Sequence, residues 1–172
     1  MKKSAILRKK IMERRAVVVP GAHDALSAKV IEKAGFEAVQ ISGYGLAGSY
    51  LGMPDVGILQ FKDLLEITGN IADAVNIPVM ADLDTGGGNA INAAENTKKL
   101  MARGVAGMNI EDQEFPKRCG HMSGKSVIPS EEMAGKIRAC SDVRNNIDPD
   151  FIINARTDVF AIEGIDEAIR RC

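Results

Sequence analysis

The 172-residue chain carries 22 Lys and Arg residues against 23 Asp and Glu residues, so its net charge of −1 provides no broad field for nucleic acid or anionic lipid. Apolar residues make up 45% of the chain and aromatic residues only 4%, which is typical of a soluble globular protein and disfavours a base-stacking platform. No stretch approaches the roughly 20 apolar residues of a membrane span. Three widely spaced cysteines argue against a disulfide framework and for a reducing compartment, so we expect a cytoplasmic location. From the balanced charge and the lack of a membrane span, we expect no nucleic-acid or membrane partner.

The chain alternates short apolar runs with longer amphipathic ones. Basic residues are interleaved with Ile and Leu over 4–15, which predicts an amphipathic helix; a targeting peptide is less favoured because no apolar run or cleavage site follows. The short apolar runs predict five strands: 16–19, 38–42, 79–83, 106–110 and 151–155. The longer runs predict further helices: 24–34, 60–75, 89–103, one that starts at Ser130 with capping residues, and 165–171.

Three connections between these elements stand out. A glycine-rich loop, 43–48, follows the second strand. The loop 112–129 is long for a link between a strand and a helix, and loops of that length are usually functional or disordered. Three consecutive glycines, 86–88, allow a tight turn near a ligand, but they form neither a GxGxxG nor a Walker sequence, so a nucleotide site is disfavoured.

The order of elements, strand then helix with apolar strands, predicts a parallel sheet covered on both faces. Polar residues fall at the C-terminal ends of successive strands: Ser42, Asp82, Asp84, Glu111 and Arg156. Contributions from four strands indicate a ring, so a (β/α)8 TIM-type barrel is favoured over a doubly wound open sheet. Because a whole barrel takes about 250 residues, we expect residues 1–172 to be a single barrel domain that holds the first five βα units and lacks the C-terminal ones.

Two aspartates at the end of the third strand are a candidate metal site. Asp82 and Asp84 are two residues apart, so on a strand both side chains project to one face. Their carboxylates repel unless a cation lies between them, and Mg²⁺, or Mn²⁺ in its place, takes one or two protein carboxylates together with water and substrate. Glu111, at the end of the next strand, can accept hydrogen bonds from those waters. The alternative is a solvated turn with a capping aspartate.

Cys119 lies among Lys117, Arg118 and His121 in the long loop. Positive neighbours favour the thiolate, so such a cysteine can exchange protons near neutral pH. A single cysteine is more often a small buried residue, but a polar, glycine-containing loop disfavours a place in a core. A zinc site and a papain-like nucleophile are disfavoured, because a second ligand pair and the local signature are missing.

Arg156 is a candidate for two-pronged binding of a substrate carboxylate, with a salt bridge at the barrel rim as the alternative. Ser42, Gly43 and Tyr44 offer backbone N–H groups and hydroxyls at a strand end, which also suits an anion. A small carboxylate substrate is therefore the expected partner of the site.

The motif Lys-Arg-Cys-Gly-His at 117–121 resembles the signature of the isocitrate lyase and phosphoenolpyruvate mutase superfamily. Further matching segments occur in the same order: 20–25, 42–43, 51–55, 82–84, 110–113 and 155–158. The resemblance implies a (β/α)8 barrel with a swapped C-terminal helix, assembled as homodimers or homotetramers. It also implies Mg²⁺ held by Asp82 and Asp84 with Glu111 in its water shell. The implied substrate-binding residues are Ser42, Gly43, Tyr44, Asp55 near the site, Cys119, Gly120 and Arg156.

Within the superfamily, the resemblance places a cysteine at this position in carbon–carbon lyases and not in phosphonate mutases. Segments 42–44, 86–90 and 116–124 resemble the 2,3-dimethylmalate lyase side of the branch shared with methylisocitrate lyase. This implies cleavage of a 2-hydroxy di- or tricarboxylate into a 2-oxo acid and a second acid, with Cys119 as the general acid/base and Lys117 and His121 assisting it. An oxaloacetate hydrolase or decarboxylase, or a non-catalytic barrel fragment, remains the alternative.

Overall fold

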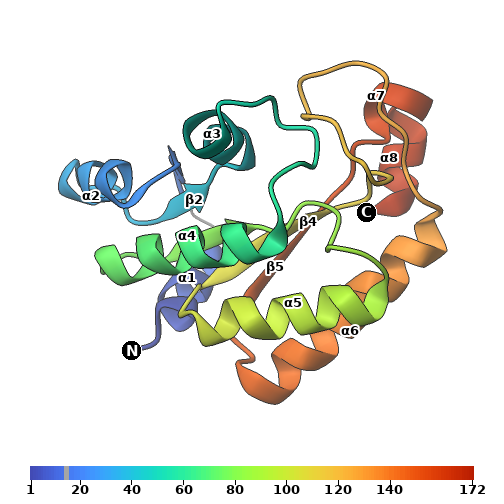
Figure 1. The fold of residues 1–172 in the computed structure, drawn as a ribbon. Coiled ribbons are helices and arrows are strands. Elements are labelled where there is room, and N and C mark those ends of the chain that lie inside the picture. Colours follow the sequence, from blue (N-terminus) through green and yellow to red (C-terminus); the bar gives the residue numbers. More distant parts are fainter. Residues whose placement is uncertain (14–15) are drawn as a thin grey trace.

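The computed structural model describes residues 1–13 and 16–172, and its centre is a five-stranded parallel sheet (Figure 1). The strands are β1 (Gly21–Ala22), β2 (Val39–Ile41), β3 (Val79–Asp82), β4 (Gly107–Glu111) and β5 (Ile152–Arg156). They lie side by side in chain order, β1-β2-β3-β4-β5, and each pairs in parallel with the next. The predicted α/β class and parallel sheet are confirmed.

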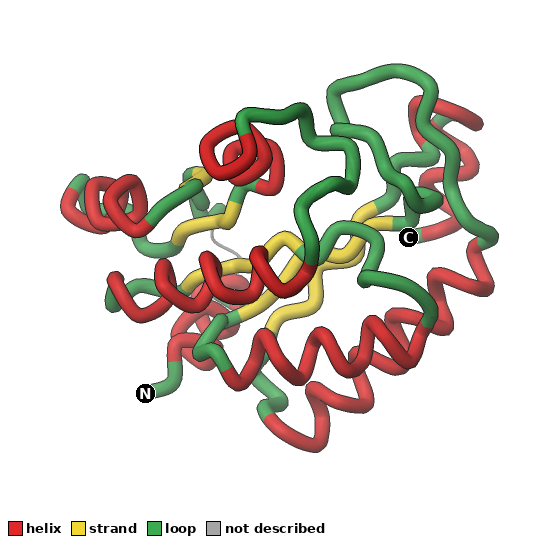
Figure 2. Tube along the Cα trace, in the orientation of Figure 1, coloured by secondary structure: helices red, strands yellow, loops and turns green. Residues whose placement is uncertain are grey.

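Helices connect the strands and pack on one another in chain order (Figure 2). They are α1 (Lys3–Met12), α2 (Ala25–Lys33), α3 (Gly43–Leu46), the π-helix η1 (Ala47–Leu51), α4 (Phe61–Ala74), α5 (Ala90–Ala102), α6 (Ser130–Ile147), α7 (Phe160–Glu163) and α8 (Ile165–Arg171). Helix α2 contacts α4, α4 contacts α5, and α5 contacts α6, so these four helices form one layer along the sheet. Among the described residues, no helix is long and apolar enough to cross a membrane.

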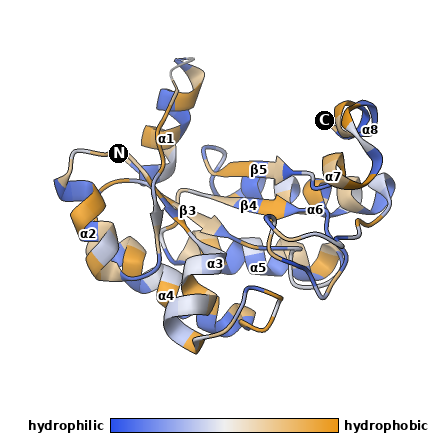
Figure 3. Cartoon of the chain, turned by 90° about the horizontal axis from the view of Figure 1, so that it is seen from above, coloured by the Kyte–Doolittle hydropathy of each residue, from blue (hydrophilic) through white to orange (hydrophobic). Residues whose placement is uncertain are grey.

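The two faces of the sheet differ in polarity because successive strand residues point to opposite sides. On one face, Val79, Ala81, Met108 and Ile110 pack in clusters with residues of the helical layer. Figure 3 shows the hydrophobic stretches along β3, β4 and β5. Residues of the opposite face are largely polar: Gln40, Asp82, Asn109, Glu111, Asn154 and Arg156. The expectation of a sheet buried under helices on both faces is therefore wrong for this chain, since α1 packs only near the N-terminal ends of the strands, around Leu7.

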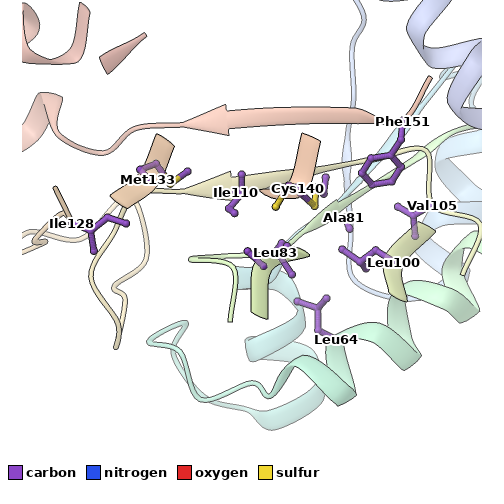
Figure 4. Close-up of a cluster of buried hydrophobic side chains, with 12 residues drawn as sticks. Leu64, Ala81, Leu83, Leu100, Val105, Ile110, Ile128, Met133, Cys140 and Phe151 are labelled. Carbon is purple, nitrogen blue, oxygen red and sulfur yellow. The ribbon is translucent and has the colours of Figure 1, made fainter. Parts of the chain in front are cut away.

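The largest hydrophobic cluster joins β3 and β4 to helices α4, α5 and α6 (Figure 4). Leu100, Met108 and Ile110 are completely buried in it, and Phe151 is 1% exposed. Side chains of this kind each contribute roughly 1.5–3 kcal/mol on burial. This cluster holds the carboxyl ends of β3 and β4 at fixed positions, and those ends carry the candidate metal residues.

The predicted position of the first strand is wrong. Residues 16–19 were expected to form the first strand, but the paired strand is β1, Gly21–Ala22, and positions 14–15 of the predicted first helix lie outside the described residues. Pro20 has no N–H to donate, although its carbonyl accepts from Gln40 N at 2.9 Å. Val17 and Val19 instead pack against the cluster around Leu7.

The glycine-rich loop predicted at 43–48 is helical, as α3 and η1. Ser42 accepts a hydrogen bond from Gly45 N at 3.0 Å and so caps this helix, which offsets the low helix propensity of glycine. Helix α7 was not predicted. At α6 the residue before the helix is Pro129, and no side-chain capping bond forms there, so Ser130 does not cap as expected.

We predict that Leu100→Ala lowers the free energy of unfolding by about 2–5 kcal/mol, because it leaves a cavity in the fully buried cluster. Ile91 lies on the same helix with 77% of its surface exposed, so Ile91→Ala is the matched control and should change stability by less than about 0.5 kcal/mol. Urea unfolding followed by circular dichroism measures both. Equal losses in the two variants would contradict the described packing of α5.

Candidate active site

Polar residues from four strand ends and from the long loop surround one cavity of about 410 Å³. The cavity is lined by Val19, Gly21, Gln40, Ile41, Ser42, Gly43, Tyr44, Asp55, Asp82, Asn109, Glu111, Lys117, Cys119, Gly120, His121 and Arg156. The structure thus brings together every site residue predicted from the sequence except Asp84. That aspartate contacts Lys117 at the edge of the same cluster. Whether the predicted residues have the predicted roles remains a prediction.

Lys117 occupies the centre of a carboxylate cluster. Its Nζ lies 2.7 Å from each oxygen of Asp55 and 2.6 Å from Asp84 Oδ1, and its side chain is 4% exposed. Asp55 comes from the segment after η1, Asp84 from the turn after β3 and Lys117 from the long loop. One buried cation therefore ties together three segments that are distant in the sequence.

The two aspartates at the end of β3 lie near each other for a different reason from the one predicted. Asp82 ends the strand, whereas Asp84 lies beyond it in a turn with φ +50°, a left-handed conformation. The Asp82 Oδ1 atom accepts from Asp84 N at 3.3 Å, and Asp82 Oδ2 accepts from Gly43 N at 3.2 Å. A Cβ at position 43 would lie 2.8 Å from Asp82 Oδ2, so any larger residue would have to displace this carboxylate. The carboxylates are neighbours because of the turn and not because of strand alternation.

Burial makes these carboxylates reluctant to ionise without a cation. It raises the pKa of Asp82, and together with the negative charge of Asp82 it raises the pKa of Asp84 to about 6. Burial also raises the pKa of Glu111 to about 8, although Arg156 and Lys117 oppose the shift. For Lys117, burial opposes the charged form, but Asp84 and Asp55 outweigh it and raise the pKa further, so this lysine stays charged at neutral pH.

The donor set fits a hard divalent cation. Asp82, Asp84 and Glu111 supply carboxylate oxygens, and Glu111 Oε1 is buried with no hydrogen-bond partner in the described part of the chain. Within residues 1–13 and 16–172, no three His, Cys, Asp or Glu side chains stand close enough to form a complete ligand set. Mg²⁺ suits such a site, because it usually binds one or two protein carboxylates and keeps several waters.

Arg156 lies on the other side of Glu111. Its Nη1 is 3.3 Å from Glu111 Oε2, and its Nη2 donates to Asp158 Oδ1 at 2.9 Å. A Cβ at Gly120 would stand 2.1 Å from Arg156 Nη2, so the glycine makes room for the guanidinium. The salt bridge offered as an alternative is present, yet the Arg156 side chain is 40% exposed in the cavity wall and can still meet an anion.

The predicted thiol lies in the same cavity. Cys119 is a free cysteine, 8% exposed, and it belongs to none of the three hydrophobic clusters. His121 and Tyr44 are exposed at the cavity wall. Residues that carry a thiol, carboxylates and a guanidinium therefore line one cavity.

No role was predicted from the sequence for several polar residues in or near the site. Asn109 and Gln40 line the cavity, and Asn109 could have been found because it lies two residues before Glu111 on the same strand. Gln113 and Asp158 fall within the segments 110–113 and 155–158 that carry the resemblance, but no role was predicted for either. Gln113, in the long loop, donates from Nε2 to Asp158 Oδ2 at 3.0 Å across 45 positions of sequence. No local sequence pattern predicts a hydrogen bond between residues so far apart in the chain.

The sequence of residues 7–172 matches the family model described as phosphoenolpyruvate phosphomutase, and the chain belongs to that family. It is 47% identical over 171 residues to 2,3-dimethylmalate lyase of Eubacterium barkeri, covering 99% of this chain and 58% of that protein. It is 48% identical over 165 residues to a chloroplastic carboxyvinyl-carboxyphosphonate phosphorylmutase of Arabidopsis thaliana, covering 94% and 48%. It is 40% identical over 165 residues to 2-methylisocitrate lyase of Escherichia coli K12, covering 95% and 55%. The chain spans about half the length of these relatives.

Solved structures agree with this family. A crystal structure of 2,3-dimethylmalate lyase, described as a member of the PEP mutase/isocitrate lyase superfamily, superposes with a TM-score of 0.95 at 36% identity, covering 99% of this chain and 57% of that one. A phosphonopyruvate hydrolase in complex with oxalate and Mg²⁺ superposes with a TM-score of 0.90 at 36% identity, covering 99% and 58%. The predicted membership of the superfamily is confirmed.

We predict that Lys117→Met lowers the free energy of unfolding by about 3–5 kcal/mol at pH 8, because it leaves Asp55 and Asp84 buried without their cation. The loss should shrink as the pH falls from 8 to 5, because the pKa of Asp84, about 6 in the parent, rises further once the lysine that lowers it is gone, and a protonated Asp84 carries no charge. Lys62, exposed on α4, provides the control Lys62→Met, which should have little effect. Denaturant unfolding at pH 5, 6.5 and 8 measures both variants, and a loss in Lys117→Met independent of pH would contradict this view of the cluster.

Proposed function

We propose that the protein is a Mg²⁺-dependent carbon–carbon lyase that cleaves a 2-hydroxy di- or tricarboxylate, of the 2,3-dimethylmalate or 2-methylisocitrate type, into a 2-oxo acid and a second carboxylic acid. One observation carries the proposal: Asp82, Glu111, Arg156 and Cys119 line the same cavity. The first two supply oxygen ligands, the arginine suits a carboxylate, and the thiol can deliver a proton. The lyase names of two relatives support this class, and the resemblance associates the loop cysteine with lyases and not with mutases.

We also propose that the chain is the first five βα units of a (β/α)8 barrel. Strands in chain order, a single layer of consecutive helices and a polar second face all suit a wall that curves around a barrel axis. The exposed apolar side chains of α7 and α8, Phe160, Ile165 and Ile169, would then be covered by further units or by a second copy in a homodimer or homotetramer.

In this proposal Asp82 and Asp84 hold Mg²⁺, and Glu111 accepts from its waters. When bound, Mg²⁺ would polarise the 2-hydroxyl and its neighbouring carboxylate and ease transfer of the hydroxyl proton to a carboxylate of the site, a role for which the pKa of Glu111, about 8, is suited. The known complex of phosphonopyruvate hydrolase with oxalate and Mg²⁺ supports such a site on this fold. Lys117, which stays charged, holds Asp55 and Asp84 in place and adds positive charge beside the substrate.

The other residues act on the substrate directly. Arg156 and the donors of Ser42, Gly43 and Tyr44 would bind carboxylates and stabilise charge as the C2–C3 bond breaks. Cys119 would give its proton to the carbon that leaves as an enolate, with His121 at the entrance to assist recovery of that proton. Closure of the loop 112–129 over the cavity would keep water away from the enolate.

We predict that Cys119→Ser abolishes cleavage while Mg²⁺ and 2-oxo acid binding persist, because the hydroxyl is far less acidic than the thiol. Turnover of dimethylmalate, methylisocitrate and oxaloacetate, assayed side by side, measures the reaction and distinguishes a lyase from an oxaloacetate hydrolase or decarboxylase. Cys140→Ser is the matched control, since Cys140 is fully buried in the cluster of α5 and α6 away from the cavity. Unchanged cleavage by Cys119→Ser would refute the role of the thiol.

We predict that Mg²⁺ binds more tightly as the pH rises from 6 to 8.5 and that binding releases protons at pH 7. The reason is that Asp84 and Glu111, with pKa values of about 6 and about 8, are partly protonated there and must ionise to meet the cation. Isothermal titration calorimetry in buffers of different ionisation enthalpy counts the protons. Affinity and proton release that do not change with pH would exclude these carboxylates as the site, and Asp84→Asn should weaken both effects.

A further inference from the structure

The buried side-chain amide of Gln113 holds the part of the loop 112–129 that carries Cys119. Gln113 is 1% exposed, and its Oε1 accepts from Arg118 N at 2.9 Å. Its Nε2 donates to Arg118 O at 2.9 Å and to Asp158 Oδ2 at 3.0 Å. The side chain therefore holds both backbone groups of the residue just before the cysteine.

A second anchor holds the residue just after the cysteine. Lys125 Nζ donates to Gly120 O at 2.6 Å and lies 3.4 Å from Asp158 Oδ1. The Lys125 side chain is 7% exposed and that of Asp158 is 9% exposed, so both anchors lie in the interior. Backbone on either side of Cys119 is thus connected to the same carboxylate.

Asp158 extends this connection to the wall of the cavity. Its Oδ1 accepts from Arg156 Nη2 at 2.9 Å, and its own N–H donates to Asp112 Oδ1 at 2.9 Å. The Asp158 carboxylate therefore connects the two loop anchors to the guanidinium in the cavity wall, and the Asp158 backbone N–H adds a bond to the first residue of the loop. Buried hydrogen bonds of this kind fix geometry, because leaving a buried donor or acceptor unpaired is energetically costly.

We propose that Gln113 and Asp158 are positioning residues that set where Cys119 stands relative to Arg156. The functional part of this proposal rests on the proposed lyase activity, in which the thiol and the guanidinium act on one substrate. Neither Gln113 nor Asp158 lines the cavity, so they act only through the groups they hold. Removal of the Gln113 amide should free the Cys119 segment without disturbing the hydrophobic core.

The three cysteines of the chain provide a direct test. Cys119, within the loop, is 8% exposed, Cys140 is fully buried in the core, and Cys172 is exposed. Iodoacetamide labelling of the full chain, followed by peptide mass spectrometry, gives a separate rate for each cysteine. The rate at Cys119 reports opening of the loop, the rate at Cys140 reports global unfolding, and the rate at Cys172 reports the activity of the reagent. In Gln113→Leu we expect labelling of Cys119 to be at least about tenfold faster with that of Cys140 unchanged.

Glu114→Gln is the matched control, because Glu114 is the exposed neighbour of Gln113 in the same loop and should leave labelling unchanged. Lys125→Met, which removes the bond to Gly120 O and the ion pair with Asp158 but keeps the Gln113 amide, is the second variant and should also free Cys119 if Gln113→Leu does not fold. Equal Cys119 rates in parent and variants, or rates at Cys119 and Cys140 that rise together, would overturn the proposal.

Turnover separates this proposal from the lyase proposal. If the parent cleaves 2-hydroxy acids, Gln113→Leu should lower kcat more than it raises KM, because substrate ligands remain while the proton donor is misplaced. A kcat equal to that of the parent despite fast Cys119 labelling would overturn the positioning role. If the parent cleaves none of the substrates, the lyase proposal fails, and the labelling rates alone decide whether Gln113 fixes the loop.

Discussion

The arrangement of the site depends on one buried ion-pair cluster, in which Lys117 lies between Asp55 and Asp84. A charge removed from water is tolerated only with close partners, and here the partners come from two segments that the lysine joins to its own loop. Because Lys117 is two residues before Cys119, the same contacts bring the thiol over the carboxyl ends of β3 and β4. Packing of the helical layer fixes those strand ends, and the lysine fixes the loop against them.

Negative charge exceeds positive charge in and beside the cavity even with Lys117 in place. Four carboxylates, of Asp55, Asp82, Asp84 and Glu111, face the two cations Lys117 and Arg156. Burial first, and the neighbouring carboxylates second, raise the pKa values of Asp84 and Glu111, and a divalent ion would favour their ionised forms. Parallel strands explain why the excess gathers here, since their carboxyl ends meet at one rim and the alternate residues of the polar face point into it.

The sequence predicted those elements whose signals are local. Asp24 and Asn89 cap α2 and α5 with reciprocal side-chain bonds, and both helices begin where these residues predicted them. Residues 16–19 look like a strand by composition, yet pairing depends on where a partner strand lies, and β2 meets the chain only from Pro20 onward. Local signals decide where an element forms only when no distant partner overrides them.

The candidate site was predictable in its residue types but not in its geometry. The motif at 117–121 and the aspartates at 82 and 84 could be read from the chain, and the structure places them around one space. The left-handed turn at Asp84 could not be read, because strand alternation and a turn both bring residues i and i+2 near each other. The link between Gln113 and Asp158 depends on contacts across 45 positions and is visible only in three dimensions.

Anomalous X-ray diffraction from crystals soaked with Mn²⁺ and oxalate would locate the cation relative to the carboxylates and the thiol. We expect an anomalous peak within coordination distance of Asp82 and Asp84, with oxalate between the ion and Arg156 and with Cys119 facing the same space. Mn²⁺ bound outside this cavity, or absent from it while Lys117 remains paired with both aspartates, would refute the proposed metal site.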